Sequence, residues 1–258
     1  SASACLASTN TPLPAITQTD SPTASPNAPL KVLSIGNSFS VNAQKHLKQI
    51  AESLNSPLLL GNAVIGGCSL ERHWRNASTN GVQYSYQKKQ LTLADYVEAE
   101  KWDIVTIQQA SGSSRFPKTY EPFGSNLIAF IKKHAPQAEV VVHETWAYRP
   151  DESRIMKWGI STDQMYADLA KAYQDFAKQH GLRVIPGGDA FQLARQTPEW
   201  GDYTPANKKT NTPASGKTLQ GKDGFHANTA GEYLLGCVWY EFLFKKDVRP
   251  APYIPQSL

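Results

Sequence analysis

Short apolar segments alternate with helical patterns along most of this chain. Five segments are rich in residues that favour strands, and each ends in glycine or polar residues. They are 32–35, 58–65, 104–109, 140–142 and 183–185. Amphipathic spacing predicts helices after residue 41, at 122–134 and at 164–180, and a last helix near residue 229. This alternation predicts an α/β fold, a three-layer α/β/α sandwich with a central, mainly parallel sheet. The order of the strands does not follow from it.

Length and charge fit one domain that acts on something other than nucleic acid. The 258 residues are 40% hydrophobic and 19% charged, which allows a substantial core. The 26 basic and 22 acidic residues give a net charge of +4 and are scattered along the chain, so no nucleic-acid partner is expected. No apolar run approaches the roughly 20 residues of a membrane span, and we expect no transmembrane segment.

The first 29 residues differ from the rest in composition. They are rich in Ser, Thr, Ala and Pro, which predicts a flexible leader at 1–29 before a domain at 30–258. Cys5 follows the small residues at 2–4. It is either the lipid anchor of a bacterial lipoprotein or an incidental cysteine in a linker. The first interpretation is our expectation, and it places the protein outside the cytoplasm, as a periplasmic, outer-membrane or secreted protein.

The first predicted strand leads into a polar turn that contains Ser38. Strand-forming residues end at Gly36, and the helical pattern begins soon after Ser38. In open α/β sheets, ligands bind where a strand ends and a helix begins. Backbone N–H groups at a helix start also face developing negative charge. We expect Asn37, which precedes the serine, to stabilise this turn.

A second polar group, Asp223-Gly224-Phe225-His226, precedes the last predicted helix. An Asp three residues before a His can hold Nδ1–H of the ring and leave Nε2 free as a base. A serine hydroxyl needs such a base to act as a nucleophile. Either motif alone is weak, because such residues commonly form turns and caps. Thr229 is the predicted N-cap of that helix, with Glu232 completing a capping box.

In this order, the motifs resemble the SGNH (GDSL-like) hydrolase superfamily, and most closely its branch called domain of unknown function 4886. The resemblance covers residues 30–244 and is far more specific than any single motif. It rests on IGNSF at 35–39, IGGCSLE at 65–71, HW at 73–74, WDIV at 102–105, QQ at 108–109, TWAY at 145–148 and DGFH at 223–226.

The resemblance implies a catalytic triad. Ser38 is the implied nucleophile, His226 the general base and then acid, and Asp223 the group that orients the imidazole. Members of the superfamily stabilise the oxyanion with the N–H of the nucleophile, a glycine N–H after the second strand and an Asn side chain after the third.

The implied oxyanion hole is only partly matched. Ser38 N–H and Gly67 N–H fit the first two donors, with Gly66 as the alternative glycine. The third donor of the superfamily, an Asn side chain, has no counterpart here, because no Gly-x-Asn follows the third predicted strand. Gln109 is the nearest amide, with Gln108 beside it, and either can donate through its NH₂ group.

Other residues near these motifs have open roles. His73 and Trp74 either contact substrate or pack against the core, and Trp146 is expected with Glu144 on the same rim. No metal or cofactor is expected. His143-Glu144 is not followed by the His-Glu-x-x-His pattern, and the cysteines lack metal-ligand spacing.

These observations predict a serine esterase that removes an acyl group, with acetyl as our first expectation, from an acylated carbohydrate. Aromatic residues in predicted loops could stack on sugar rings. They are Trp74, Trp146, Tyr148, Trp158, Trp200 and Tyr203. Lipid or aryl esters are an alternative. A non-catalytic carbohydrate-binding protein on a hydrolase fold is another. Glycoside hydrolysis by Glu144 and Asp223 is a third, but it leaves Ser38 and His226 without a role.

Overall fold

The computed structural model describes residues 27–258, and a five-stranded parallel sheet forms its centre. The strand order is β2-β1-β5-β6-β7, so β1 lies inside the sheet. Their bounds are β1 Leu30–Gly36, β2 Leu58–Val64, β5 Ile104–Ile107, β6 Glu139–His143 and β7 Arg183–Ile185. In register, Ile35 lies beside both Ala63 and Ile107. The carboxyl ends of β1, β2 and β5 therefore meet at one edge.

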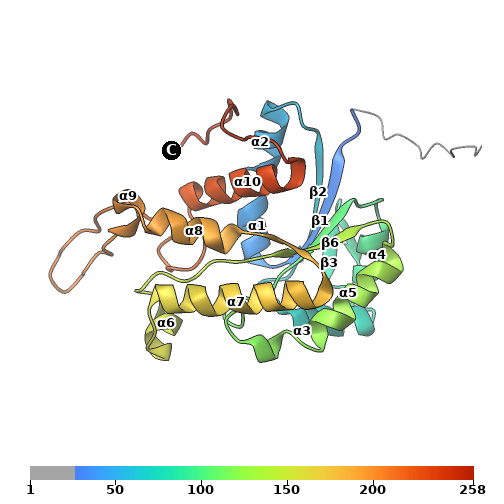
Figure 1. The fold of residues 1–258 in the computed structure, drawn as a ribbon, viewed down its shortest axis with the longest axis horizontal. Helices are drawn as coiled ribbons and strands as arrows, with labels where there is room; N and C mark the ends of the chain where they lie inside the picture. Colours follow the sequence, from blue (N-terminus) through green and yellow to red (C-terminus); the bar gives the residue numbers. More distant parts are fainter. Residues whose placement is uncertain (1–26) are drawn as a thin grey trace, which may run out of the picture.

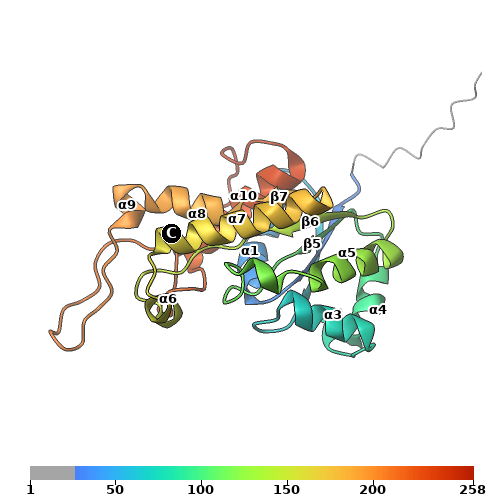
Figure 2. The same cartoon turned by 60° about the horizontal axis from the view of Figure 1, so that its bottom comes forward.

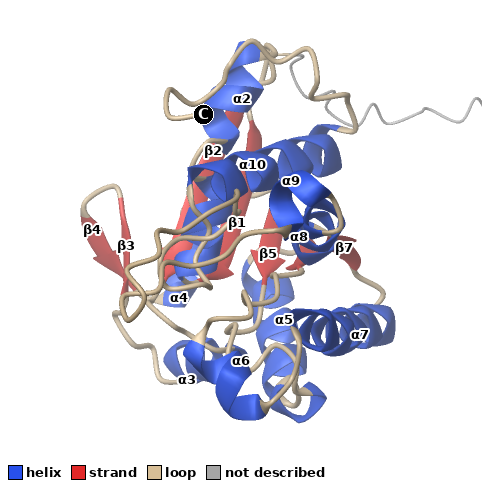
Figure 3. Ribbon diagram, turned by 90° about the vertical axis from the view of Figure 1, so that its left-hand side faces the viewer, coloured by secondary structure: helices blue, strands red, loops and turns tan. Residues whose placement is uncertain are grey.

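Helices cover both faces of the sheet, which confirms the predicted three-layer α/β/α sandwich (Figures 1 and 3). One face carries α1 Ser38–Gln44, α2 Leu47–Ser53, α8 Gly187–Arg195 and α10 Thr229–Phe244. The other carries α3 Leu70–Ser78, α4 Leu93–Glu98, α5 Phe123–His134 and α7 Thr162–His180. Residues 32–36 of β1 are all buried, as expected for a strand that is covered on both faces.

Smaller elements surround this sandwich. They are the hairpin of β3 Tyr84–Tyr86 and β4 Lys89–Leu91, the 3₁₀ turn Pro117–Thr119, α6 Ser153–Trp158 and α9 Pro198–Gly201. After α9 the chain makes a long excursion away from the body before it returns to α10 (Figure 2). Isolated bridges from Thr204 to Ser215 and from Asn207 to Thr212 hold its two sides together.

Three local expectations need correction. The helix after β1 begins at Ser38 and is interrupted at residues 45–46, which divides it into α1 and α2. The segment after Gly67, where Trp74 was expected in a loop, contains α3, which Ser69 caps by accepting a hydrogen bond from Arg72 N–H. The N-cap of α10 is Asn228 rather than Thr229, because the Asn228 side chain accepts from Gly231 N–H. Glu232 closes no capping box, and it accepts from Asn42 Nδ2 instead.

Residues 1–26 of the expected leader, Cys5 among them, lie outside the described residues. Within residues 27–258, no helix combines the length and the apolar character that crossing a membrane requires.

Candidate active site

Ser38 is the first residue of α1, and the turn before it is fixed by Asn37. Asn37 Oδ1 accepts a hydrogen bond from Phe39 N–H at 2.9 Å, which caps the helix. Its Nδ2 donates to the carbonyl oxygen of Cys68 at 3.1 Å, which links this turn to the loop after β2. The Ser38 hydroxyl therefore lies at a helix N-terminus, next to the carboxyl end of a central strand.

Ser38, His226 and Asp223 form one hydrogen-bonded line. Nε2 of His226 lies 2.7 Å from Ser38 Oγ, and Nδ1 lies 2.7 Å from Asp223 Oδ2. In the tautomer that satisfies both contacts, Nδ1–H donates to the carboxylate and Nε2 accepts from the hydroxyl. The hydroxyl is thus within reach of a base, as nucleophilic catalysis by serine requires.

The Asp223 carboxylate is held in its ionised form by its own loop. Partial burial raises the pKa of Asp223, but hydrogen bonds from Phe225 N–H and from the ring and N–H of His226 outweigh this effect. The net pKa is lowered. Asp223 Oδ1 accepts from both backbone groups at 3.0 Å, while Oδ2 takes the imidazole. One side chain therefore shapes the loop and orients the base.

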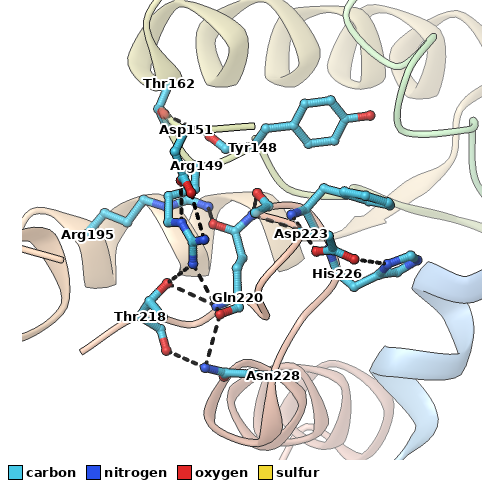
Figure 4. A network of polar contacts seen from close by, with 12 residues as sticks. Tyr148, Arg149, Asp151, Thr162, Arg195, Thr218, Gln220, Asp223, His226 and Asn228 are labelled. Carbon is cyan, nitrogen blue, oxygen red and sulfur yellow. Dashed lines mark hydrogen bonds and ion pairs between the residues drawn. The ribbon is translucent and has the colours of Figure 1, made fainter. Parts of the chain in front are cut away.

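A buried polar network holds this loop from behind (Figure 4). Gln220 Nε2 donates to the carbonyl oxygens of Gly224 and Ala147, and Gln220 Oε1 accepts from Arg195 Nη2. The Arg149 N–H also donates to the Gly224 carbonyl, at 2.8 Å. In Figure 4, His226 points from this loop toward the ribbon of α1.

A second buried network holds the serine turn. Gln108 Nε2 donates to Asn37 Oδ1 at 3.0 Å, and His143 Nδ1–H donates to Gln108 Oε1 at 3.2 Å. His73 Nε2–H donates to the carbonyl oxygen of Gly36, and its Nδ1 accepts from Tyr84 O–H. Burial lowers the pKa of His143 to about 3 and of His73 to about 4, so both rings are neutral.

A cavity of about 530 Å³ opens at the serine. Its lining is Asn37, Ser38, Phe39, Gly67, Ala110, Ser111, Gly112, Ser113, Arg154, Phe225 and His226. Among the described residues, neither Ser38 N–H nor Gly67 N–H donates a hydrogen bond. Gly67 has a φ of 64°, a conformation that favours glycine. Two backbone donors that lack an acceptor among the described residues thus belong to residues that line the cavity.

Gln109 does not have the geometry expected of a third oxyanion donor. Its Nε2 donates to the backbone and hydroxyl oxygens of Thr119, and its Oε1 accepts from Leu70 N–H and Ala110 N–H. The side chain is buried and does not line the cavity. Gln108, the alternative, is bonded to Asn37. Both amides are engaged in holding loops together.

The expected substrate contacts also need correction. His73 and Trp146 are fully buried, and Trp146 stacks on Phe39 at a centroid distance of 4.1 Å while its Nε1–H donates to the Phe225 carbonyl. Trp74 is half-buried against the core. None of the six aromatic residues expected to stack on sugars lines the serine cavity. Trp200 and Tyr203 line a separate cavity of about 280 Å³.

Sequence reasoning missed several residues that line the cavity, including Phe225 and Arg154. Phe225 lies inside the Asp-x-x-His motif, and its position between Asp223 and His226 could have indicated that it lines the cavity. Arg154 lies on α6, which no periodic pattern predicted, and only the fold brings it to this cavity.

Glu144 is buried away from the cavity, beside the N-terminus of α8. Its Oε1 accepts from Asp189 N–H at 2.7 Å. Burial, followed by the nearby Asp189 carboxylate, raises the pKa of Glu144 to about 8. This position does not suit a carboxylate paired with Asp223 for glycoside hydrolysis. Among the described residues, no group of three or more His, Cys, Asp or Glu side chains could hold a metal ion.

Comparison with known proteins gives the family. A model of the domain of unknown function DUF4886 matches residues 31–258. The chain belongs to the DUF4886 family. No match to a curated protein was found.

Similar solved structures share this fold. A DUF4886 family protein from Bacteroides uniformis has a TM-score of 0.76 at 29% identity, over 89% of this chain and 88% of that one. A provisionally assigned SGNH hydrolase from Slackia heliotrinireducens has a TM-score of 0.59 at 23% identity, over 83% and 98%. An acetyl xylan esterase has a TM-score of 0.55 at 14% identity, over 82% and 98%. This DUF4886 chain therefore has the fold of the SGNH hydrolases.

Proposed function

We propose that this DUF4886 protein is a serine esterase that releases an acyl group, with acetyl as the expected one, from an acylated carbohydrate. The observation that carries the proposal is the line from Ser38 Oγ through His226 to Asp223, with both contacts at 2.7 Å. This line opens on a cavity. A serine that only forms a turn needs no oriented imidazole beside it.

In the proposed reaction, Ser38 Oγ attacks the ester carbonyl while His226 Nε2 takes the hydroxyl proton. The tetrahedral intermediate collapses, His226 gives the proton to the leaving alcohol, and an acyl-serine remains. Water then attacks this acyl-enzyme, with the same imidazole as base, and the free acid leaves. Asp223 keeps the imidazole in the required tautomer throughout and stabilises its charged form.

The oxyanion is assigned to two backbone donors, Ser38 N–H and Gly67 N–H. Both belong to residues that line the cavity and are free of other acceptors among the described residues. The start of α1 adds its partial positive charge at the same point. Each donor in such a site is worth about 3 kcal/mol, so two of them supply several kcal/mol of transition-state stabilisation.

The carbohydrate part of the proposal rests on the character of the cavity. Its wall includes Ser111, Ser113 and Arg154, and its large apolar side chains are those of Phe39 and Phe225. A lining with this many polar groups suits a hydroxylated alcohol better than a long acyl chain. The likeness in fold to an acetyl xylan esterase is consistent with the same substrate class.

A fluorophosphonate probe tests the nucleophile directly. We expect covalent labelling at Ser38, located by peptide mass spectrometry, and loss of labelling in Ser38→Ala and in His226→Ala. Ser53→Ala is the control, because Ser53 Oγ only donates to the Ile50 carbonyl. A folded wild-type protein that stays unlabelled contradicts the proposal and favours a binding protein on this fold.

A release assay tests the substrate class. Acetylated xylan and acetylated monosaccharides should yield acetate, with much slower release from long-chain lipid esters. Labelling of Ser38 combined with preferential release of long-chain acids would retain the esterase and overturn the carbohydrate substrate.

A further inference from the structure

Arg154 places a fixed guanidinium in the wall of the proposed catalytic cavity. Its Cζ lies 4.4 Å from the ring centroid of Tyr148 and 4.6 Å from that of Phe225. Its Nε–H donates to Glu152 Oε1 at 2.9 Å. Glu152 is itself buried and caps α6 by accepting from the N–H groups of Arg154 and Ile155. Contacts with two rings and a carboxylate hold this side chain in one orientation.

The outer end of the same guanidinium remains free to bind a ligand. Among the described residues, neither Nη1 nor Nη2 of Arg154 donates a hydrogen bond to a protein group. Nη1 lies 3.2 Å from the point where a Cβ on Gly112 would lie, so the absence of a side chain there leaves room for it. No residue that lines the cavity carries a carboxylate. The cavity therefore has donors for an anion and no competing acid in its lining.

The position of Arg154 indicates which part of an ester it meets. In the proposed reaction His226 delivers a proton to the leaving alcohol, so the alcohol must lie beside the imidazole. The Phe225 ring lies 4.2 Å from that imidazole, centroid to centroid, and Arg154 packs on the same Phe225 ring. Arg154 and the imidazole thus share the Phe225 ring as a neighbour, which favours the alcohol part of the ester as the partner of the guanidinium.

We propose that Arg154 selects esters whose alcohol part is an acidic sugar with a carboxylate. This inference rests on the proposed esterase function and names the substrate class of that same site. The planar Nη pair matches the two oxygens of a carboxylate, and a guanidinium that is already fixed loses little freedom when it binds. Glu152 offsets part of the charge but leaves both Nη groups available.

A matched substrate set tests the proposal. The same acetyl ester is prepared on methyl glucuronide, on its neutral carboxyl methyl ester and on methyl glucoside. Wild-type kcat/KM should be about 10- to 100-fold higher for the glucuronide, as one charge-assisted pair provides. Arg154→Gln should remove this preference, because kcat/KM should fall at least tenfold more on the glucuronide than on the two neutral substrates. Arg154→Lys should keep part of the preference for the glucuronide, and added salt should reduce the preference of the wild type.

Arg249→Gln is the control, because Arg249 is exposed and pairs with Asp247 away from the cavity lining. Three results overturn the assignment: no preference in wild type, an equal loss on charged and neutral substrates in Arg154→Gln, or a preference for a carboxylate on the acyl group, tested with a succinyl ester.

Binding to the Ser38→Ala variant separates this inference from the esterase proposal. Calorimetry with the acetylated glucuronide and its methyl ester should show tighter binding of the acid. Hydrolysis of all three esters at one rate overturns only the role of Arg154. A protein that hydrolyses none of them and takes no fluorophosphonate overturns the esterase, and the role of Arg154 with it.

Discussion

The two halves of the proposed triad are built in different ways. The serine half is held by buried side chains from distant strands and helices, because Asn37, Gln108, His143 and His73 are all at most 2% exposed. The histidine half is a short loop whose key bonds join residues two or three positions apart. The side chains of Asp223 and His226 are 39% and 33% exposed.

Because of this difference, substitutions in the two halves should affect the catalytic rate and the free energy of unfolding to different degrees. Removing a buried polar partner from the serine half leaves donors or acceptors without water, which costs folding free energy. Removing the exposed Asp223 carboxylate should cost little stability, because water can replace its bonds, yet it should disturb the base. We therefore expect substitutions in the histidine half to lower the rate and substitutions in the serine half to lower the free energy of unfolding.

The largest effect is expected for Asp223→Asn. The amide can still accept from the N–H groups of residues 225 and 226, but its NH₂ group would face His226 Nδ1. The imidazole would then carry its proton on Nε2, facing Ser38, and could not accept the hydroxyl proton. Turnover should fall by about a thousandfold or more, while unfolding in urea changes by less than about 1 kcal/mol. Asp202→Asn, at another exposed carboxylate, is the control.

Gln109→Ala tests a buried side chain of the same kind as those that hold the serine half. The substitution leaves Leu70 N–H and Ala110 N–H without their acceptor, and we expect a loss of about 2–4 kcal/mol in the free energy of unfolding. Turnover per active site, with sites counted by fluorophosphonate titration, should stay within a few-fold of wild type. The exposed Gln83→Ala is the control. A hundredfold slower enzyme of unchanged stability would restore Gln109 as an oxyanion donor.

Gln220 lies where the histidine loop meets a buried network, so its substitutions should show both effects. Gln220→Ala loses the bonds to the Gly224 and Ala147 carbonyls and leaves the guanidinium of Arg195 without a side-chain acceptor. We expect about a tenfold fall in kcat and a loss of about 1–3 kcal/mol in stability. Gln220→Glu keeps the Arg195 contact but sets a carboxylate oxygen against the Gly224 and Ala147 carbonyls, so it should recover only part of the stability and none of the kcat. Equal recovery of both would contradict a positioning role.

How much could be predicted from the sequence depends on the range of the contacts involved. The strands of the sheet and the Asp-x-x-His loop were predictable, because apolar runs and contacts three residues apart are visible in the chain itself. The partners of Gln109 were not, since Leu70 lies 39 positions away and begins a helix where a loop was expected. Arg154 likewise reaches the cavity only through the packing of α6. From the sequence alone, a glutamine after the end of a strand is a candidate oxyanion donor, and only its neighbours in the fold show that its amide is already bonded.

Glu144→Gln should have the smallest effect on turnover, and its effect on stability should depend on pH. Because the folded protein raises the pKa of Glu144 to about 8, it binds this proton more tightly than the unfolded chain does. The stability from this group is complete below the ordinary pKa of a glutamate, near 4.3, and is lost as pH rises through about 8.

Unfolding in urea at pH 5 and at pH 8.5 measures this loss. Wild type should lose up to a few kcal/mol across the range, since one pKa unit is worth about 1.4 kcal/mol. Glu144→Gln should lose less, because a neutral amide can still accept from Asp189 N–H but has no proton to release. The exposed Glu199→Gln should match wild type. An equal loss in the Glu144 variant would place the titrating group elsewhere.

Since Glu144 does not line the cavity, kcat at neutral pH should stay near wild type, which separates this buried carboxyl group from Asp223.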